Sequence, residues 1–352
     1  MLAAVCHGKQ DVRVEPREER PLGADEVRVA VAFGGICGSD MHYYHRGGVG
    51  DFLIREPMTL GHEISGRVLE TGQAVTGLRP GMKAALDPSR PCLSCRYCRE
   101  GRANLCTNML FLGSAARFPH VQGGFAQTLV LRHDQVIPVP EETDLLRLSV
   151  AEPLSVGLHA VNRAGTLTGK RVIVSGSGPI GLLTARSARF AGAVEVVTTD
   201  IEDAPLTVAR EQMGASRTVN VAKNPEALAE FEADGGYFDV ALEASGAPAA
   251  LGSLFKVIRR GGRIVQVGMM PAGAAAPIPI NFLQSREIDL VGAFRAHDEF
   301  RLATELIVSG QIDVSAILSG TYPLSEAATA LELAGNRSKV VKLHLAMSHP
   351  SA

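Results

Sequence analysis

The sequence lacks tryptophan altogether, and aromatic residues make up only 5% of its 352 residues. It also lacks any apolar run of the ~20 residues that a membrane-spanning helix needs. An excess of charge of one sign is missing too, because 35 basic residues face 37 acidic ones and leave a formal net charge of −2. Neither a membrane nor a nucleic acid is therefore expected as the main partner.

A signal peptide is not expected, because the segment from Met1 to His7 turns polar too early. The sequence therefore predicts a cytoplasmic protein. That location disfavours disulfides, so the six cysteines are expected to serve metal binding or redox chemistry. A chain of this length with 46% hydrophobic residues is expected to form about two domains.

The first part of the chain, to about Val150, has the pattern of a β-rich domain. Short runs such as Val27–Val31 and Ile64–Leu69 alternate between apolar and polar positions, and glycines and prolines separate them. Many short strands with frequent turn signals predict a small β barrel or sandwich.

A cysteine cluster interrupts this β pattern. It consists of Cys92, Cys95, Cys98 and Cys106. Four thiolates at this spacing predict a closed tetrahedral zinc shell, which is a structural site. A disulfide pair and an iron–sulfur cluster are the alternatives. The arginines of the segment also leave open a zinc module that binds nucleic acid, although a solvated loop is the favoured interpretation.

A second group of metal-ligand types is spread more widely. Cys37 and His62 offer the thiolate and imidazole that zinc prefers, and a catalytic zinc uses about three protein ligands and leaves one position open. Taken singly, each is more often a core residue. Glu63 and Glu152 are the candidate carboxylate ligands. Ser39, two residues after Cys37, is a candidate for proton transfer.

Around Gly165 the pattern changes to apolar strands that alternate with helical stretches, which predicts a parallel sheet covered on both faces. The strand Arg171–Ser175 leads into a Gly-x-Gly-x-x-Gly motif and then a helix, the context that the dinucleotide-binding fingerprint requires. The helix N-terminus would supply N–H groups for the phosphates. The candidate cofactor-binding residues of the motif are Gly176, Gly178, Pro179, Ile180 and Gly181.

Asp200 ends the next strand, about twenty residues after the glycines, where an acid binds the ribose hydroxyls of adenosine. Its charge would repel the 2′-phosphate of NADP, and the following segment 201–203 has no basic residue to attract that phosphate. NAD is therefore favoured over NADP. Val267 follows a later strand end, where ligands bind in such sheets, and completes the cofactor-binding set.

In this order and combination, the motifs resemble the zinc-dependent medium-chain alcohol/polyol dehydrogenases over essentially the whole chain. The resemblance is carried by Gly61-His62-Glu63, the cysteine cluster, Glu152-Pro153 and the glycine motif. Within the family, the sorbitol and threonine dehydrogenase branch is the closer match. The L-idonate 5-dehydrogenases in that branch match best, through residues 35–44, 111–125 and 292–295.

The resemblance implies an α/β fold in which a GroES-like, β-rich catalytic domain carries an inserted Rossmann domain with a doubly wound parallel sheet. The expected bounds are 1–154 and 293–352 for the catalytic domain and 155–292 for the Rossmann domain. The last strand, Val340–Leu345, is expected to return to the N-terminal β domain. A homotetramer is the implied assembly, with a homodimer as the alternative.

The resemblance further implies a catalytic zinc on Cys37 and His62, with the third ligand from Glu63 or Glu152, and a structural zinc on the four clustered cysteines. The expected reaction is NAD-dependent oxidation of a secondary alcohol, in a sugar acid such as L-idonate or, alternatively, in a neutral polyol. Zinc would lower the pKa of the alcohol, Ser39 would carry its proton outward, and hydride would pass to the nicotinamide.

A sugar acid adds a further requirement, because its carboxylate needs a cationic partner. Arg117 and Arg295 are the candidates for that partner, and Tyr43 is a candidate for bonding a substrate hydroxyl. An ordinary surface ion pair is the competing interpretation for each arginine.

Overall fold

The computed structural model describes residues 1–271 and 273–347, which fall into two compact units. One unit combines residues 1–152 and 300–336 with the segment that starts at Lys342, and the other combines residues 153–299 and 337–341. Within the described ranges, no helix is both long enough and apolar enough to cross a membrane.

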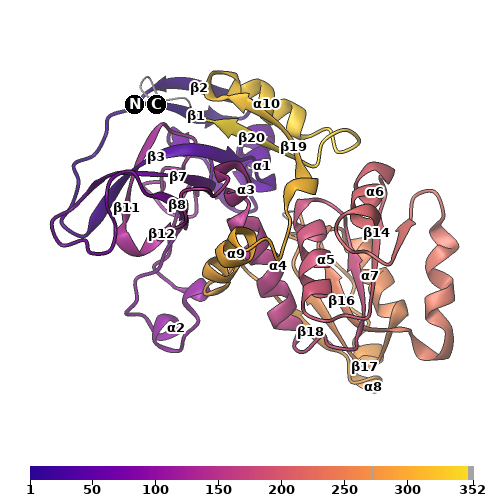
Figure 1. Ribbon diagram of the computed structural model, residues 1–352. Helices are drawn as coiled ribbons and strands as arrows, with labels where there is room; N and C mark the ends of the chain where they lie inside the picture. Colours follow the sequence, from indigo (N-terminus) through magenta and orange to yellow (C-terminus); the bar gives the residue numbers. More distant parts are fainter. Residues whose placement is uncertain (272, 348–352) are drawn as a thin grey trace. The chain divides into compact units, whose positions relative to one another are not determined.

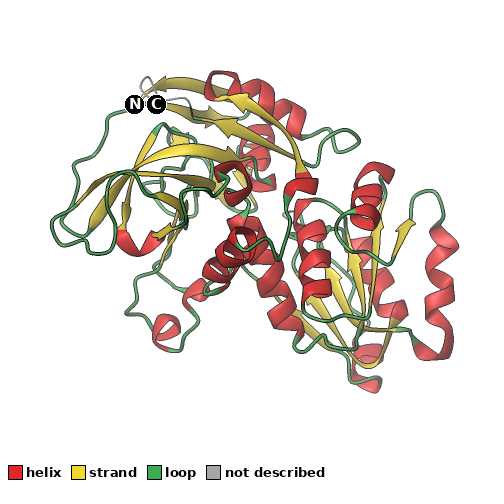
Figure 2. Ribbon diagram, viewed as in Figure 1, coloured by secondary structure: helices red, strands yellow, loops and turns green. Residues whose placement is uncertain are grey.

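The first unit is built mainly of β-strands, drawn in yellow in Figure 2. Its main sheet has seven strands in the order β12-β8-β7-β3-β20-β19, and β11 also pairs with β3. Their bounds are β3 (Glu26–Gly35), β7 (Glu63–Thr71), β8 (Lys83–Leu86), β11 (Thr128–Arg132), β12 (Val136–Pro138), β19 (Leu318–Pro323) and β20 (Lys342–Ala346).

Strand β3 shows why this sheet forms. Val27, Val29 and Val31 are fully buried at every second position, so one face of the strand lies in the core. The predicted last strand is present as β20, which pairs antiparallel with β3 and places His344 opposite Gly35. A segment from the far end of the described chain thus lies beside one of the first strands.

Smaller elements complete the first unit. The further strands are β1 (Leu2–Gly8), β2 (Asp11–Pro16), β4 (Gly48–Val49), β5 (Phe52–Leu53), β6 (Met58–Thr59), β9 (Ser89–Arg90) and β10 (Leu110–Phe111). The helical segments are α1 (Gly38–Arg46), α2 (Arg96–Arg99), η1 (Ala103–Leu105), η2 (His133–Gln135), α3 (Leu145–Leu148), α9 (Glu299–Val308), η4 (Ser315–Ile317), η5 (Leu324–Glu326) and α10 (Ala327–Ala334).

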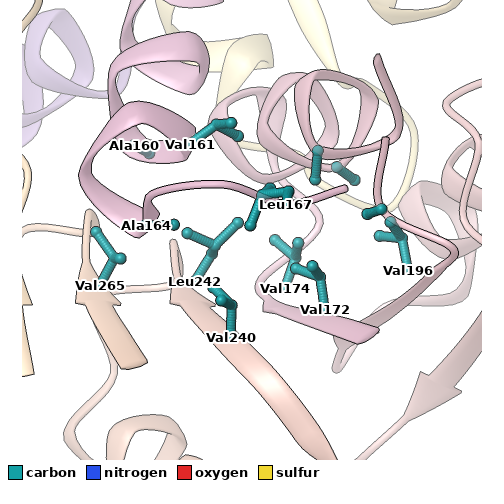
Figure 3. Packing of buried hydrophobic residues seen from close by; sticks show 13 residues of the cluster. Ala160, Val161, Ala164, Leu167, Val172, Val174, Val196, Val240, Leu242 and Val265 are labelled. Atoms are coloured by element: carbon teal, nitrogen blue, oxygen red, sulfur yellow. The ribbon is translucent and has the colours of Figure 1, made fainter. Parts of the chain in front are cut away.

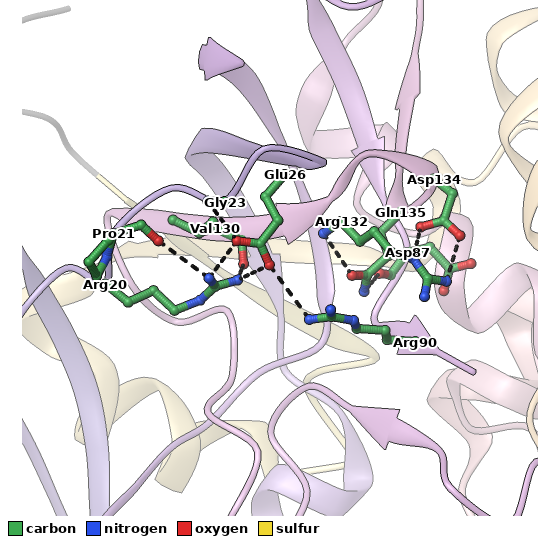
Figure 4. A network of polar contacts seen from close by, with 10 residues as sticks. All are labelled: Arg20, Pro21, Gly23, Glu26, Asp87, Arg90, Val130, Arg132, Asp134 and Gln135. Carbon is green, nitrogen blue, oxygen red and sulfur yellow. Dashed lines mark hydrogen bonds and ion pairs between the residues drawn. The ribbon is translucent and has the colours of Figure 1, made fainter. Parts of the chain in front are cut away.

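A polar network ties the start of β3 to the β9–β10 ribbon (Figure 4). Arg20 donates two hydrogen bonds to the Glu26 carboxylate, at 2.6 and 2.7 Å, and Arg90 of β9 lies 3.7 Å from the same carboxylate. The hydrogen bond from Arg20 is the main effect that lowers the pKa of Glu26, which is only 6% exposed. Because Arg90 comes two residues before Cys92, this network fixes the base of the cysteine segment.

The second unit contains a six-stranded sheet in the order β15-β14-β13-β16-β17-β18, and every pairing in it is parallel. Figure 1 labels several of its strands and helices. The strands are β13 (Arg171–Ser175), β14 (Glu195–Asp200), β15 (Arg217–Asn220), β16 (Phe238–Glu243), β17 (Ile258–Gln266) and β18 (Asp289–Gly292). The helical segments are α4 (Ala151–Ala164), α5 (Pro179–Phe190), α6 (Asp203–Glu211), η3 (Pro225–Gly235), α7 (Pro248–Val257) and α8 (Ile280–Ser285).

Alternation along the central strands divides the core of this unit into two layers. Val172 and Val174 of β13 face one layer together with residues of α4 and α5, and Figure 3 shows this packing. Ile173, between them, faces the opposite layer, which η3 and α7 cover. Both faces of the parallel sheet are therefore buried, as in doubly wound folds. The α/β fold class predicted from the sequence is confirmed.

We expect Leu242→Ala to lower the free energy of unfolding of the second unit by about 2–5 kcal/mol, because it leaves a cavity in a close-packed core. Leu242 of β16 is fully buried in the layer of Figure 3. Denaturant unfolding monitored by circular dichroism measures the change. The matched control is Val194→Ala, since Val194 is 60% exposed and its truncation should cost less than about 0.5 kcal/mol. Equal losses in the two variants would contradict the assigned core.

Candidate active site and dinucleotide site

Three of the predicted metal ligands come together in the first unit. One donor atom each from Cys37, His62 and Glu63 lies within 4.8 Å of the other two. Cys37 immediately precedes α1, and Glu63 begins β7, where it stands opposite Gly35 of β3. A β-carbon at Gly35 would overlap the Glu63 carboxylate, so glycine is required there. His62 and Glu63 are buried and Cys37 is half-buried, and this set of sulfur, nitrogen and oxygen donors matches what a catalytic zinc needs.

Asp40 fixes the backbone on which two of these ligands stand. It is fully buried in α1 and accepts hydrogen bonds from the N–H groups of Cys37 and Gly61, each at 3.0 Å. Its carboxylate lies 3.9 Å from Nδ1 of His62, which is beyond hydrogen-bonding distance. Nδ1 of His62 is buried and makes no hydrogen bond within the described part of the chain. Asp40 thus joins the two ligand-bearing turns through their backbones.

The buried ammonium group of Lys342 balances the charge of the Glu63 carboxylate. Lys342 of β20 donates to Oε2 of Glu63 at 2.5 Å and to the carbonyl of Ile36 at 3.1 Å. The two charged side chains are 2% and 1% exposed. Burial acts to lower the pKa of Lys342, but the charges of Glu63 and Cys37 outweigh it and the pKa is raised. Burial likewise opposes ionisation of Glu63, yet Lys342 brings its pKa below the ordinary value.

Without a bound cation, Cys37 is a neutral thiol. Burial, and then the charge of Glu63, raise the pKa of the Cys37 thiol to about 12. A bound cation lowers the pKa of Cys37 again, because it stabilises the thiolate.

His344 lies two residues after Lys342 and is fully buried. Burial, followed by the charge of Lys342, lowers the pKa of His344 to about 3. His344 is therefore neutral at ordinary pH.

The two remaining catalytic candidates lie close to this cluster. Ser39 is half-buried in the first turn of α1, two residues after Cys37. Glu152 lies in the first turn of α4 and interacts electrostatically with His62 and Glu63. Burial raises the pKa of Glu152 to about 8, His62 opposes the rise, and Glu63 adds to it. Glu152 does not belong to the set of donors within 4.8 Å of one another.

The four clustered cysteines also come together. One sulfur from each of Cys92, Cys95, Cys98 and Cys106 lies within 4.8 Å of the others, and all four are free thiols. Backbone N–H groups of Cys92 and Asn108 each donate to the sulfur of Cys106 at 3.3 Å. Such bonds stabilise thiolates, and hydrogen bonds from Ser94 are the leading cause that lowers the pKa of Cys92 to about 5. The donor set fits a tetrahedral zinc without an open position.

The dinucleotide motif has the geometry that its spacing predicts. Gly176 follows β13 with φ +92°, and Gly178 is the residue before α5, which begins at Pro179 and continues through Ile180. A β-carbon at Gly181 would overlap the carbonyl of Gly176, so strand and helix approach closely only because glycine is present. The first turn of α5 leaves backbone N–H groups for an anion. These residues fit the diphosphate of a dinucleotide.

A cavity of about 390 Å³ adjoins this motif within the second unit. Its lining includes Gly176, Asp200 and Leu254. Val267 follows β17, and its backbone N–H donates to the carbonyl of Glu243. Asp200 is 6% exposed, and Arg337 lies 3.0 Å from its carboxylate. Because Gly176 follows β13 and Asp200 ends β14, the cavity lies at the carboxyl ends of the parallel strands, where ligands of doubly wound sheets bind.

The three candidate substrate residues have different surroundings. The hydroxyl of Tyr43, on α1, is buried and accepts a hydrogen bond from the backbone of Ala115 at 3.0 Å. The guanidinium of Arg117 donates to the carbonyls of Thr107 and Met109, next to the cysteine cluster. Arg295, in the second unit, has the left-handed φ of +57° and stacks over the ring of Phe294, 4.8 Å from its centre.

Lys342, His344 and Arg337 were not among the residues predicted from the sequence. Lys342 and His344 alternate with leucines in an otherwise apolar terminal strand, a placement typical of inward-facing polar groups. That alternation is the signal that identifies the first two. Arg337 lies outside any regular element and offers no comparable signal.

The fold and the two sites define a zinc-binding dehydrogenase, and the chain belongs to that family. Residues 23–141 match the family model described as the alcohol dehydrogenase GroES-like domain, and residues 179–309 match the model described as zinc-binding dehydrogenase. These matches confirm the resemblance predicted from the motifs and, with it, zinc and a nicotinamide dinucleotide as cofactors.

Relatives of known identity match over nearly the full chain. L-idonate 5-dehydrogenase (NAD(P)(+)) of Escherichia coli K12 is 41% identical over 317 residues, which are 90% of this chain and 90% of that protein. Sorbitol dehydrogenase of Bacillus subtilis is 35% identical over 95% of this chain and 93% of its own. The crystal structure of the E. coli L-idonate 5-dehydrogenase superimposes with a TM-score of 0.93, covering 98% of this chain and 97% of that one.

We expect the purified protein to contain two zinc ions per chain, and each cluster to lose its own ion independently. Cys37→Ser should remove one zinc, and Cys98→Ser should remove the other, since each change deletes one thiolate from a separate donor set. Elemental analysis of the folded variants measures this, and Cys6→Ser, a buried cysteine outside both clusters, is the control. A Cys98→Ser protein that keeps both ions would refute the structural site.

The buried ion pair yields a stability prediction. Lys342→Met should destabilise the first unit by about 3–5 kcal/mol, because it leaves the Glu63 carboxylate buried without a counter-charge. Arg67→Met removes a pair from the same strand β7, but Arg67 and its partner Glu141 are 39% and 68% exposed, so a loss of at most about 1 kcal/mol is expected. Equilibrium unfolding in urea compares the two, and similar small losses would show that the buried pair is not needed.

Proposed function

We propose that this chain oxidises a secondary alcohol of a sugar acid with NAD(P), and that its substrate is L-idonate, converted at C5 to 5-dehydro-D-gluconate. The observation that carries the reaction type is the close approach of donor atoms from Cys37, His62 and Glu63. The substrate rests on the 41% identity to the E. coli L-idonate 5-dehydrogenase, together with the TM-score of 0.93 to its structure.

Each residue of the site has a defined task in this proposal. When bound, zinc supplies Lewis acidity towards the alcohol oxygen, and the nicotinamide accepts hydride. Cys37, His62 and Glu63 would hold the metal. Lys342 keeps the Glu63 carboxylate ionised through one oxygen, and a carboxylate has about four lone-pair sites, so the same group can also bind a cation. Glu152, beside the cluster, is the alternative carboxylate ligand.

Ser39 is assigned the transfer of the proton that the substrate alcohol releases. Ser39 lies in the first turn of α1, two residues after Cys37, and is partly exposed, so its hydroxyl can accept a proton from an alcohol at the site and release it towards solvent. Asp40 holds the turn in place through the N–H of Cys37. Its full burial keeps its carboxylate on that backbone rather than on the substrate.

Recognition of the sugar-acid carboxylate is assigned to an arginine. Arg295 has a left-handed backbone conformation, which costs about 1–3 kcal/mol for a non-glycine residue and is concentrated at functional sites. Arg117 is the second candidate, although its donors are used on carbonyls near the cysteine cluster. Tyr43 is retained as a candidate partner for a substrate hydroxyl.

A neutral polyol is the second candidate substrate. The sorbitol dehydrogenase of B. subtilis is 35% identical over 95% of this chain, which supports a polyol less strongly than the 41% match supports L-idonate. The two substrates differ by a carboxylate, so a carboxylate-binding arginine distinguishes them.

The remaining assignments concern the setting of the enzyme. We propose catalytic and Rossmann domain bounds of 1–154 with 293–352 and of 155–292, a homotetrameric assembly, and a cytoplasmic location. The last is supported by the thiols of both donor sets, since zinc binding requires reduced cysteines. Light scattering on the purified protein tests the assembly.

The test of the function is a substrate panel of sugar acids and polyols followed by NADH or NADPH absorbance, with zinc content measured on the same sample. L-idonate should give the highest kcat/KM. Arg295→Gln should raise KM for L-idonate about 10- to 100-fold and leave KM for sorbitol within about threefold, because only the acid loses a charge-assisted bond. Arg117→Gln is the parallel variant that separates the two candidates.

Turnover of neutral polyols without turnover of L-idonate would overturn the substrate assignment in favour of the polyol. Equal effects of Arg295→Gln on both substrates would remove Arg295 from carboxylate recognition. Activity that survives complete removal of zinc would overturn the proposed chemistry itself.

A further inference from the structure

We propose that Arg337 is the residue with which this chain binds the 2′-phosphate of NADP, and that its ion pair with Asp200 sets the balance between NAD and NADP. The proposal rests on the proposed function only in taking a nicotinamide dinucleotide as cofactor. It departs from the sequence-based argument, in which Asp200 without a nearby basic residue favoured NAD.

The Asp200 carboxylate has its acceptor sites occupied from within the second unit. Oδ2 accepts from the N–H of Ser177 at 2.6 Å and from Nη2 of Arg337 at 3.0 Å. Oδ1 accepts from the N–H groups of Ile201 at 2.7 Å and Glu202 at 3.1 Å. A carboxylate offers about four lone-pair sites, so the ribose hydroxyls of NAD reach Asp200 only by displacing a donor.

Arg337 is the donor that can be displaced. The other three are backbone N–H groups held by the glycine-rich turn and by the end of β14. The Arg337 side chain is 50% exposed, whereas Asp200 is 3% exposed. A half-exposed long side chain can change rotamer at little cost, while a backbone N–H at a buried turn cannot.

The location of the guanidinium suits a phosphate on the adenosine ribose. Nη2 of Arg337 lies 3.0 Å from Oδ2 of Asp200, the acid expected at the ribose, and 3.6 Å from the position that a β-carbon would take at Gly178, so the group lies between the Asp200 carboxylate and the glycine-rich turn. It also lines the cavity of about 390 Å³, and among the described residues that line this cavity it is the only basic one. The apolar side of the cavity, which includes Val221 and Leu228, suits an adenine ring.

The charges around the ribose position are partly balanced. Asp203 at the start of α6 is paired with Lys223 and accepts from Asn220 at 2.6 Å, so its charge is compensated. Arg337 compensates Asp200 in the same way. A guanidinium has five N–H donors in a planar fork that matches phosphate, so Arg337 can turn from the carboxylate to a 2′-phosphate.

The arrangement has two alternative states. With NAD, Asp200 bonds the ribose hydroxyls and Arg337 moves outward. With NADP, Arg337 bonds the 2′-phosphate and offsets its repulsion by Asp200. Loss of Arg337 should therefore weaken NADP binding while leaving NAD binding unchanged or slightly tighter.

The test compares two fragments that differ only in the 2′-phosphate. Isothermal calorimetry on the full chain measures binding of 5′-AMP and of 2′,5′-ADP. Arg337→Gln should weaken 2′,5′-ADP by about 10- to 100-fold, the effect of a charge-assisted hydrogen bond, and change 5′-AMP by less than about threefold. Asp200→Asn should tighten 2′,5′-ADP, and Arg337→Lys should retain part of the affinity. Arg210→Gln, an exposed arginine of α6 outside the cavity lining, should change neither.

Three results would overturn the proposal: no binding of 2′,5′-ADP by the unaltered protein, an equal loss for both fragments in Arg337→Gln, or no loss for either. Thermal unfolding confirms that each variant is folded. The ratio of kcat/KM for NADP to that for NAD should fall by the same factor as fragment binding. Because the fragments contain neither nicotinamide nor sugar acid, failure of L-idonate turnover leaves the calorimetric result intact.

Discussion

The buried ion pair between Lys342 and Glu63 is the interaction on which the donor cluster of Cys37, His62 and Glu63 depends. Both side chains are almost completely inaccessible, and they come from strands β20 and β7, which both flank β3. An unpaired charge at this depth would cost several kcal/mol, so the sheet and the site stabilise each other. Pairing of β20 with β3 brings the ammonium group to the carboxylate, and the carboxylate then remains ionised beside Cys37 and His62 as a cation site requires.

Local sequence patterns were sufficient to predict the dinucleotide motif and the cysteine cluster. The strand-glycine-helix context identified the dinucleotide motif, and the structure gives it the expected turn and close approach at Gly176 and Gly181. The spacing of the four cysteines identified a second donor set, because all its members lie within one short segment. Helix α4 could have been predicted as well, since Leu154, Leu158 and Val161 are buried at helical spacing after Pro153 in the first turn.

What could not be predicted depends on contacts between distant parts of the chain. Nothing near Lys342 in the sequence indicates that it faces Glu63, 279 residues away, and nothing near Arg337 indicates Asp200, 137 residues away. The sequence neighbours of Asp200 include no basic residue, whereas the fold supplies one in Arg337. The same limit applies to Arg117, whose donors bond the backbone beside the cysteines. Tertiary folding determines which charges meet, and periodicity gives no information about it.

The order of the strands along the chain has a consequence for synthesis on the ribosome. Glu63 leaves the ribosome 279 residues before Lys342, which corresponds to roughly 15–55 s at about 5–20 residues per second. All six strands of the parallel sheet, from β13 to β18, are made within that interval. Until Lys342 is made, the Glu63 carboxylate has no ammonium partner, so the cluster of Cys37, His62 and Glu63 reaches its final charge balance only with the last strand.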